Sequence, residues 1–298
     1  MNDQEKQLVV YGAGGWLGRS FVSTALERFN VFPESNLVLI GSKCRKIQVG
    51  KWELNVHSSK DALDLITPGA IFINSAFLRR ENLTIMSPQD YSISNNEISQ
   101  FAREVVETRQ LSSFVNLSSG AAAIASLNSR STIDIYGDLK RQWETKFREV
   151  CTEVKCNFIN NRIYSISGRY INEFRNLALS TFIRKSLNNE AVTVNSPNAF
   201  RSYVDAEQLS EVVLKLSLGG FAGDLDSGGF LVNMEQLARL IVKVIGKGYV
   251  EVSESPSSAK DYLGNHQAFN AVAQSLGVDL NHLDVQILRT TKAFLKDS

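Results

Sequence analysis

Apolar and polar positions along the first half of the chain form blocks that alternate between a strand-like and a helix-like pattern. Four short apolar runs predict buried strands, at residues 8–11, 35–41, 70–77 and 114–117. Between them, residues 19–26 and 95–108 repeat apolar side chains at helical spacing. Alternating strands and helices indicate parallel strands joined by right-handed crossovers. We therefore expect an α/β protein with a Rossmann-type, doubly wound parallel sheet.

The second half of the chain has a less regular pattern. It predicts helices at residues 174–187, 206–218 and 234–245 and a strand at 191–195. Several glycines between the last two helices indicate loops rather than a domain linker. We expect residues 1–165 to form a dinucleotide-binding domain and residues 166–298 to form mainly a small substrate-binding lobe packed closely on it.

A glycine-rich turn directly follows the first predicted strand. Its sequence is Gly12-Ala13-Gly14-Gly15-Trp16-Leu17-Gly18. Such a turn directs backbone N–H groups and the positive end of a helix dipole at one spot, where an anionic pyrophosphate is stabilised. Gly12 permits the turn, Gly15 lets the backbone approach the phosphates, and Gly18 allows the helix to pack closely on the strand. The pattern predicts a dinucleotide site, and a tight turn without a ligand is the alternative.

Composition and charge restrict the choice of partner. The chain has 298 residues, of which 43% are hydrophobic and 21% charged, and its formal net charge is +1. No global field would attract nucleic acid or a membrane surface, and no apolar stretch approaches the ~20 residues of a membrane span. The three cysteines form no CxxC pair and the three histidines are scattered, so we expect no metal site and no disulfide framework. We expect a cytoplasmic protein that binds a small molecule.

The end of the second predicted strand bears on which dinucleotide binds. An NAD site usually has Asp or Glu about 20 residues beyond the glycines, where the carboxylate binds the ribose hydroxyls and would repel a 2′-phosphate. This chain has Gly41-Ser42-Lys43-Cys44-Arg45-Lys46 instead. Small polar and cationic side chains, here Ser42 and Arg45, favour the 2′-phosphate, so we expect NADP(H) rather than NAD(H). A solvated basic turn without a ligand is the alternative.

Three residues with complementary chemistry follow in the order serine, tyrosine, lysine. Ser118 and Ser119 stand at the end of the run 114–117, and Tyr136 and Lys140 open a predicted helix. On a helix these two side chains share a face, and an ammonium beside a phenol lowers the pKa of the phenol from its usual value of about 10. Such a tyrosine can exchange a proton with a carbinol oxygen that a serine hydroxyl holds. We expect Ser119, Tyr136 and Lys140 to be catalytic.

At this point the sequence resembles the extended branch of the short-chain dehydrogenase/reductase superfamily, in its NAD(P)-dependent epimerase/dehydratase, nucleotide-sugar-modifying family. The glycine-rich turn resembles that branch's GxxGxxG, Ser118-Ser119 its strand-end serines, and Tyr136-Gly137-Asp138-Leu139-Lys140 its YxxxK. The small residues at the end of the run 70–77 are those of a strand that faces a ligand crevice. The predicted cofactor site is Gly12, Gly14, Gly15, Trp16, Leu17, Ser42, Arg45, Ser75, Ala76, Tyr136 and Lys140.

The resemblance continues into the second half of the chain. Residues 162–169 resemble the "R-[IL]-[FY]-N-x-[YV]-G" segment of nucleotide-sugar enzymes, with Ser165 in place of Asn. Residues 200–207 resemble their "R-D-[FY]-[VI]-H-V-D-D" segment, in which the arginine matching Arg201 often meets a diphosphate. An arginine in a structural ion pair is the alternative. The resemblance implies that Ser118, Ser119, Ser165 and Arg201 contact a nucleoside diphosphate sugar.

The resemblance also limits the reaction. Dehydratases of the family carry Asp-Glu directly after the Ser or Thr, whereas this chain has Gly120 and Ala121, so dehydration is disfavoured. We expect an NADPH-dependent 4-keto reductase of a nucleotide sugar, of the type that serves deoxysugar or surface polysaccharide biosynthesis. An NAD-dependent nucleotide-sugar 4-epimerase is the enzymatic alternative, and a non-catalytic dinucleotide-sensing regulator is the alternative of another class. In this family the helices that correspond to residues 95–108 and to the helix with Trp143 and Phe147 commonly pair across a homodimer, so the resemblance also implies a homodimer. Ordinary burial of their apolar faces against the sheet is the alternative.

Overall fold

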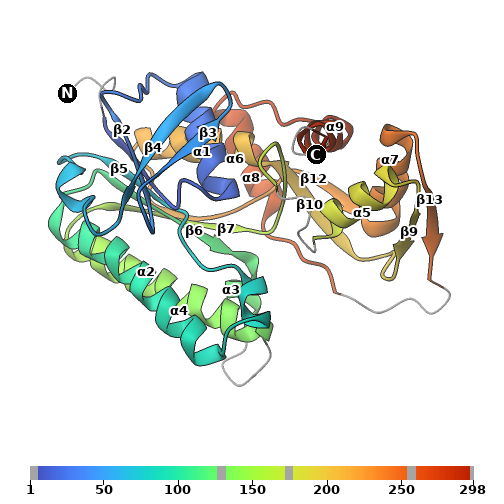
Figure 1. Ribbon diagram of the computed structural model, residues 1–298, viewed down its shortest axis with the longest axis horizontal. Helices are drawn as coiled ribbons and strands as arrows, with labels where there is room; N and C mark the ends of the chain where they lie inside the picture. Colours follow the sequence, from blue (N-terminus) through green and yellow to red (C-terminus); the bar gives the residue numbers. More distant parts are fainter. Residues whose placement is uncertain (1–5, 126–131, 172–176, 254–259, 296–298) are drawn as a thin grey trace. The chain divides into compact units, whose positions relative to one another are not determined.

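The computed structural model describes residues 6–125, 132–171, 177–253 and 260–295. The chain divides into two compact units (Figure 1). The first comprises residues 1–163 with 210–225, and the second comprises residues 164–209 with 226–298. The chain therefore returns to the first unit after residue 209. The division expected from the sequence, with one boundary after residue 165, has no such return.

In the described residues, the first unit is built on an eight-stranded sheet with the strand order β11-β7-β6-β5-β1-β2-β4-β3. The strands are β1 (Leu8–Tyr11), β2 (Leu37–Gly41), β3 (Arg45–Val49), β4 (Trp52–Ser58), β5 (Ile71–Asn74), β6 (Ser113–Ser119), β7 (Asn157–Ile163) and β11 (Gly223–Asp226). From β7 across to β4 neighbouring strands are parallel, and β3 pairs antiparallel with β4. The chain leaves β1 for β2 on one side and later returns to β5 on the other, so the strand order reverses between β1 and β5. This is the doubly wound sheet expected from the sequence.

Helices cover both faces of this sheet (Figure 1). They are α1 (Trp16–Arg28), α2 (Pro88–Thr108), α3 (Gly120–Ile124), α4 (Thr132–Glu153) and α6 (Ala206–Leu218), with short 3-10 turns η1 (Leu63–Leu65) and η2 (Arg80–Thr84). The apolar sides of α2 and α4 bury Phe72, Phe114 and Phe158 of β5, β6 and β7 in one cluster. Trp143 and Phe147 of α4 are buried in the same cluster, so these two aromatic residues belong to the core of their own unit.

A row of buried asparagines crosses the sheet beside this aromatic cluster. Asn74, Asn116 and Asn160 lie in register on β5, β6 and β7. The Asn74 amide donates to Asn116 at 3.3 Å, and the Asn116 amide donates to Asn160 at 3.1 Å. The row ends on Asp224, which accepts from Asn160 at 2.9 Å and from Arg148 at 2.6 Å. Since buried amides need partners, the row fixes the register of the strands that lead to the site.

Replacing the middle amide should destabilise the fold. Asn116→Leu keeps the side-chain size but leaves the Asn74 amide N–H and the Asn160 amide oxygen without their Asn116 partner, and we expect a loss of about 2 kcal/mol in the free energy of unfolding. Urea denaturation measures the change. As a matched control, Asn55→Leu alters an exposed position on β4 and should stay within about 0.5 kcal/mol of the parent. Equal effects of the two substitutions would contradict the role of the row.

In the second unit, β8 (Ser165–Ser167), β10 (Phe200–Asp205) and β12 (Phe230–Asn233) form a three-stranded sheet, and β9 (Ala191–Val194) pairs in parallel with β13 (Tyr249–Val252). Its helices are α5 (Ala178–Leu187), α7 (Met234–Ile245), α8 (His266–Ser275) and α9 (Leu283–Phe294). Two bonds tie α9 to the end of β8: Ser167 donates to Gln286 at 2.7 Å, and the Gly168 amide donates to Thr290 at 3.0 Å. Arg289 of α9 pairs with Asp205 and Glu207.

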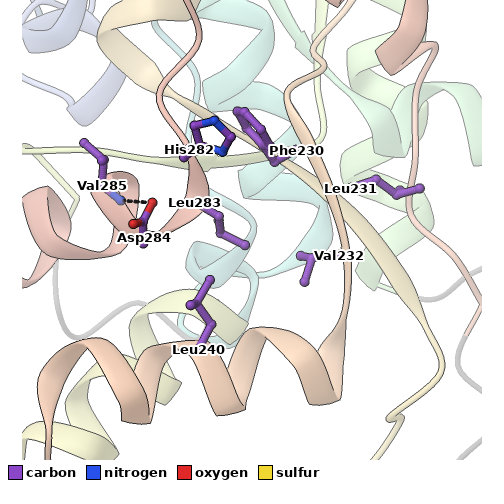
Figure 2. Close-up of a pocket in the computed structure, with 8 residues that line it drawn as sticks. All are labelled: Phe230, Leu231, Val232, Leu240, His282, Leu283, Asp284 and Val285. Carbon is purple, nitrogen blue, oxygen red and sulfur yellow. Dashed lines mark hydrogen bonds between the residues drawn. The ribbon is translucent and has the colours of Figure 1, made fainter.

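A hollow of about 450 Å³ opens beside β12 and is drawn in Figure 2. Its lining residues are Phe230, Leu231, Val232, Leu240, His282, Leu283, Asp284 and Val285. The His282 ring packs on Phe230 with 4.7 Å between centroids. The hollow contains none of the predicted site residues.

Each predicted strand and helix has a counterpart in the structure, with differences at several ends. The elements that were not predicted are β3, β4, β7, β8, β10, β11, β12, β13, α3, α8 and α9. The basic segment at residues 41–46, for which a solvated turn was the alternative to a 2′-phosphate site, contains the start of β3, since Arg45 already pairs with Val56 of β4. Ile47 and Val49 of β3 are buried and alternate with polar residues, as in a strand. The two charged residues before them, Arg45 and Lys46, obscure this pattern in the sequence. Helix α2 starts at Pro88 rather than at residue 95, because Ser87 caps it by accepting from the Asp90 amide. The expected helix at residues 174–187 is described from Ala178 as α5; residues 172–176 lie outside the described part.

Candidate active site

The glycine-rich turn connects β1 to α1 and lies against the end of β5. Gly12 has a φ of +85°, and a Cβ there would lie 2.7 Å from the Ala76 backbone nitrogen and 2.8 Å from the Ser75 carbonyl carbon. Ser75 is held in place by two bonds to the Tyr11 carbonyl, from its amide at 2.9 Å and its hydroxyl at 2.7 Å. The structure thus brings together Gly12, Ser75 and Ala76, which the sequence analysis assigned to the cofactor site although they lie far apart in the chain. The approach is so close that only glycine fits at position 12.

The amino end of α1 has the properties of an anion site. Gly15 stands at the cap position with no side-chain cap, and no acidic residue occurs in the first turn, which contains Trp16 and Leu17. The Arg45 guanidinium reaches from β3 to the Gly14 Cα, where a Cβ would collide with it. Donors at a helix amino end together with a cation stabilise a pyrophosphate. These residues fit the pyrophosphate of a dinucleotide, whereas Ser42 is exposed just beyond β2.

The predicted catalytic residues lie at the end of β6 and on α4 of the same unit. The Lys140 ammonium donates to the Leu117 carbonyl at 2.9 Å and lies 3.9 Å from the centre of the Phe77 ring. Tyr136 meets the same ring edge to face, with 5.8 Å between centroids. Ser119 ends β6 and caps α3 by accepting from the Ala121 amide at 3.2 Å. The Phe77 ring, which the sequence analysis did not select, therefore packs on both Tyr136 and Lys140.

Lys140 is buried, and this changes its charge state. Its side chain is enclosed by the packing of α4 on the sheet, and burial lowers the pKa of its ammonium to about 7. The carboxylate of Glu144, one turn further along α4, opposes this and raises the pKa. Lys140 is thus charged below neutral pH and loses its charge as the pH rises through about 7.

Ser118 and Ser119, neighbours in sequence, have different surroundings. The Ser118 hydroxyl is buried and donates to the Glu144 carboxylate at 2.5 Å. Glu144 also accepts from Arg162 at 2.7 Å. The Ser118 hydroxyl is thus already bound to Glu144. Its predicted contact with a substrate would be an additional role. Glu144 was missed, although it follows Lys140 by one helical turn, the spacing that first selected Lys140.

Two predicted substrate residues, Ser165 and Arg201, belong to the second unit. Ser165 starts β8 and is in register with Tyr203 of β10. The Arg201 guanidinium donates to the Phe200 carbonyl at 2.7 Å and to the Lys260 carbonyl at 3.2 Å. It also lies over the Tyr262 ring, 5.7 Å from the centroid. Among the described residues, two carbonyls and the Tyr262 ring hold Arg201. This arrangement differs from the structural ion pair that was the alternative to a contact with a diphosphate.

The described residues thus form a doubly wound α/β fold in which Tyr136 and Lys140 pack on one aromatic ring. Solved structures with this fold include UDP-sugar 4-epimerases, which are NAD-dependent members of the extended short-chain dehydrogenase/reductase family. The resemblance expected from the sequence is confirmed at the level of fold. No protein-family model and no curated protein sequence matches the chain.

Three of these structures illustrate the likeness. The UDP-N-acetylglucosamine 4-epimerase of Methanobrevibacter ruminantium M1, in complex with UDP-N-acetylmuramic acid, has a TM-score of 0.77 at 13% identity, covering 99% of this chain and 100% of that one. The UDP-glucose 4-epimerase of Thermus thermophilus, in complex with NAD, has a TM-score of 0.74 at 14% identity, covering 98% and 100%. The UDP-glucuronic acid 4-epimerase of Bacillus cereus, in complex with UDP-glucuronic acid and NAD, has a TM-score of 0.73 at 13% identity, covering 98% and 100%.

The expectation of NADP(H) was wrong. Four similar structures of the same fold are complexes with NAD, among them the epimerases of Thermus thermophilus and Bacillus cereus just described. The physical reason lies in Arg45, whose charge was assigned to a 2′-phosphate beyond β2. Its guanidinium instead covers Gly14 in the glycine-rich turn. A cation there compensates the pyrophosphate that NAD and NADP share, so it does not discriminate between them.

Neither a metal-binding cluster nor a membrane-spanning helix occurs among the described residues. No group of three or more His, Cys, Asp or Glu side chains in the described ranges is arranged to hold a metal ion. None of the helices in those ranges has the length and apolar content that crossing a bilayer requires.

Proposed function

We propose that the protein is an NAD-dependent 4-epimerase of a nucleoside diphosphate sugar. The observation that carries the proposal is the placement of Tyr136 and Lys140 on one aromatic ring, Phe77, within a fold that the UDP-sugar 4-epimerases share over their whole length. The 4-keto reductase expected first from the sequence depended on NADPH, and the correction of the cofactor removes that support. The epimerase, the alternative from the sequence, is therefore preferred.

The chain's own residues account for the proton transfer that epimerisation needs. Tyr136 is assigned to take the proton of the C4 hydroxyl and to return it after the configuration has changed. The Lys140 ammonium stabilises the phenolate form of Tyr136 by its charge. Ser119 is assigned to hold the C4 oxygen by a hydrogen bond. When bound, NAD would accept the hydride of C4 and give it back.

Other residues are assigned to binding. Gly12, Gly14, Gly15, Arg45 and the amino end of α1 would hold the pyrophosphate of NAD. Ser75 and Ala76, at the end of β5, would lie beside the dinucleotide. Ser165 and Arg201 of the second unit are proposed to contact the nucleotide sugar, Arg201 through its guanidinium and the diphosphate. A homodimer and a role in surface polysaccharide synthesis stay predictions from the sequence.

The proposal is tested by offering UDP-glucose, UDP-N-acetylglucosamine and UDP-glucuronic acid to the purified protein with NAD. We expect one of them to equilibrate with its C4 epimer, measured by proton NMR, without net consumption of NAD, because the hydride is returned in each cycle. Net oxidation of a reduced dinucleotide by a 4-keto sugar would instead identify a reductase. Binding of NAD without conversion of any sugar would favour the dinucleotide-sensing regulator.

A further inference from the structure

A buried carboxylate stands behind the tyrosine–lysine pair. On α4, Tyr136, Lys140 and Glu144 follow one another at intervals of one helical turn and so share a face. Glu144 is 4% exposed and Lys140 is 7% exposed. A carboxylate is seldom buried unless something compensates its charge, so its position needs an explanation.

Partners from two neighbouring strands of the sheet hold Glu144. From β6, the Ser118 hydroxyl donates to Oε1 at 2.5 Å. From β7, Arg162 donates through Nη2 to Oε2 at 2.7 Å and through Nε to both oxygens at 3.1 Å. Hydrogen bonds from these donors fix the carboxylate in one place. Ser118 immediately precedes Ser119, so the same carboxylate also holds the end of β6.

The Glu144 carboxylate influences the site through its effect on the pKa of Lys140. The groups that face the Lys140 ammonium are Glu144 on α4, the Leu117 carbonyl on β6 and the Phe77 ring, on which Tyr136 also packs. Glu144 is the negatively charged group that raises the pKa of Lys140 against the lowering by burial. Because that pKa is about 7, even a modest fall would leave the lysine mostly neutral at neutral pH.

We propose that Glu144 is a positioning residue of the active site, which keeps Lys140 charged and, through Ser118, holds the strand end that carries Ser119. The inference rests on the proposed function for its assay of turnover, but the charge on Lys140 can be followed without turnover. Arg162 compensates the carboxylate, so that a buried negative charge is tolerated beside the pair.

The test compares turnover of Glu144→Gln with that of the parent from about pH 5.5 to about pH 8.5, with NAD present. The amide keeps the size of the side chain and one acceptor oxygen but removes the charge. We expect the ratio of variant to parent rates to fall about tenfold between the acid and the alkaline end, because Lys140 loses its proton at lower pH in the variant. A ratio that is constant with pH would mean a merely structural role and would overturn the proposal.

Two further variants separate this effect from a loss of stability. Glu211→Gln removes a carboxylate of the same unit that pairs with Arg28 and Lys215, and it should leave the shape of the pH profile unchanged. Should Glu144→Gln not fold, the double variant Glu144→Gln with Arg162→Met carries the test, because it leaves no unpaired buried charge. We expect the same pH-dependent deficit in the double variant, and its absence there would also overturn the proposal.

A spectroscopic measurement distinguishes failure of this inference from failure of the proposed function. Ultraviolet difference absorbance reports the phenolate of Tyr136 in the protein with NAD and no sugar, and Tyr136→Phe identifies the signal. Glu144→Gln should lower the phenolate fraction near neutral pH several-fold, whether or not any sugar is converted. An unchanged phenolate fraction overturns the role of Glu144 even if the protein is an epimerase.

Discussion

Tyr136→Phe will lower the rate of C4 epimerisation by about 10³-fold, within the range that a positioned proton-transfer group contributes. The ring remains to pack edge to face on Phe77, so the fold and the binding of NAD should be unchanged. Only the hydroxyl that exchanges the proton is lost. The measurement is the initial rate of sugar interconversion by NMR, together with the amount of NAD released on denaturation.

Tyr91, a buried tyrosine, provides the control. Tyr91 of α2 is fully buried, its hydroxyl donates to the Leu78 carbonyl at 2.7 Å, and burial raises the pKa of its phenol above the ordinary range. It therefore stays protonated and cannot act as a base. Tyr91→Phe should cost about 1 kcal/mol of stability through the lost hydrogen bond and leave the rate within a few-fold of the parent. If Tyr136→Phe retained comparable activity, Tyr136 would not be the proton-transfer group.

Gly12→Ala will remove dinucleotide binding and lower the free energy of unfolding by about 2 to 5 kcal/mol, the sum of two effects. A φ of +85° disfavours alanine by about 1 to 2 kcal/mol. The added Cβ would also press on the backbone of Ser75 and Ala76, at 2.7 and 2.8 Å, where no side chain can rotate away, and such overpacking adds about 1 to 3 kcal/mol. Chemical denaturation and titration with NAD measure the two effects.

Gly69→Ala separates the two causes. Gly69 has nearly the same conformation, with a φ of +81°, but nothing lies within 4 Å of an added Cβ. We expect this variant to lose about 1 to 2 kcal/mol and to bind NAD as the parent does. Similar losses of stability and binding in both variants would show that backbone strain alone, rather than the close approach of β5 to the turn, determines the effect at Gly12.

The sequence carried enough information to predict the frame of the site. The apolar run at residues 8–11 and the glycines after it predicted the turn between β1 and α1, because burial and a tight turn leave few residue choices. Tyr136 and Lys140 were selected by their helical spacing, and the structure places both against Phe77. These features depend on contacts between residues close in the chain, which is why a local pattern records them.

Long-range packing decided the rest. Both strand-end serines looked equivalent, yet Ser118 is committed to Glu144 because α4 places that carboxylate against β6. Arg45 was expected to meet a 2′-phosphate, but the antiparallel pairing of β3 with β4 carries its guanidinium to Gly14, and with that the basis for expecting NADP(H) disappeared. Glu144 shared the helical spacing of Tyr136 and Lys140, but nothing in the sequence showed that Ser118 and Arg162 would hold it. The residue types and their local spacing thus determined the fold class and the choice of Tyr136 and Lys140. The hydrogen-bond partner of each polar side chain was decided by segments distant in sequence, because the sheet brings those segments together.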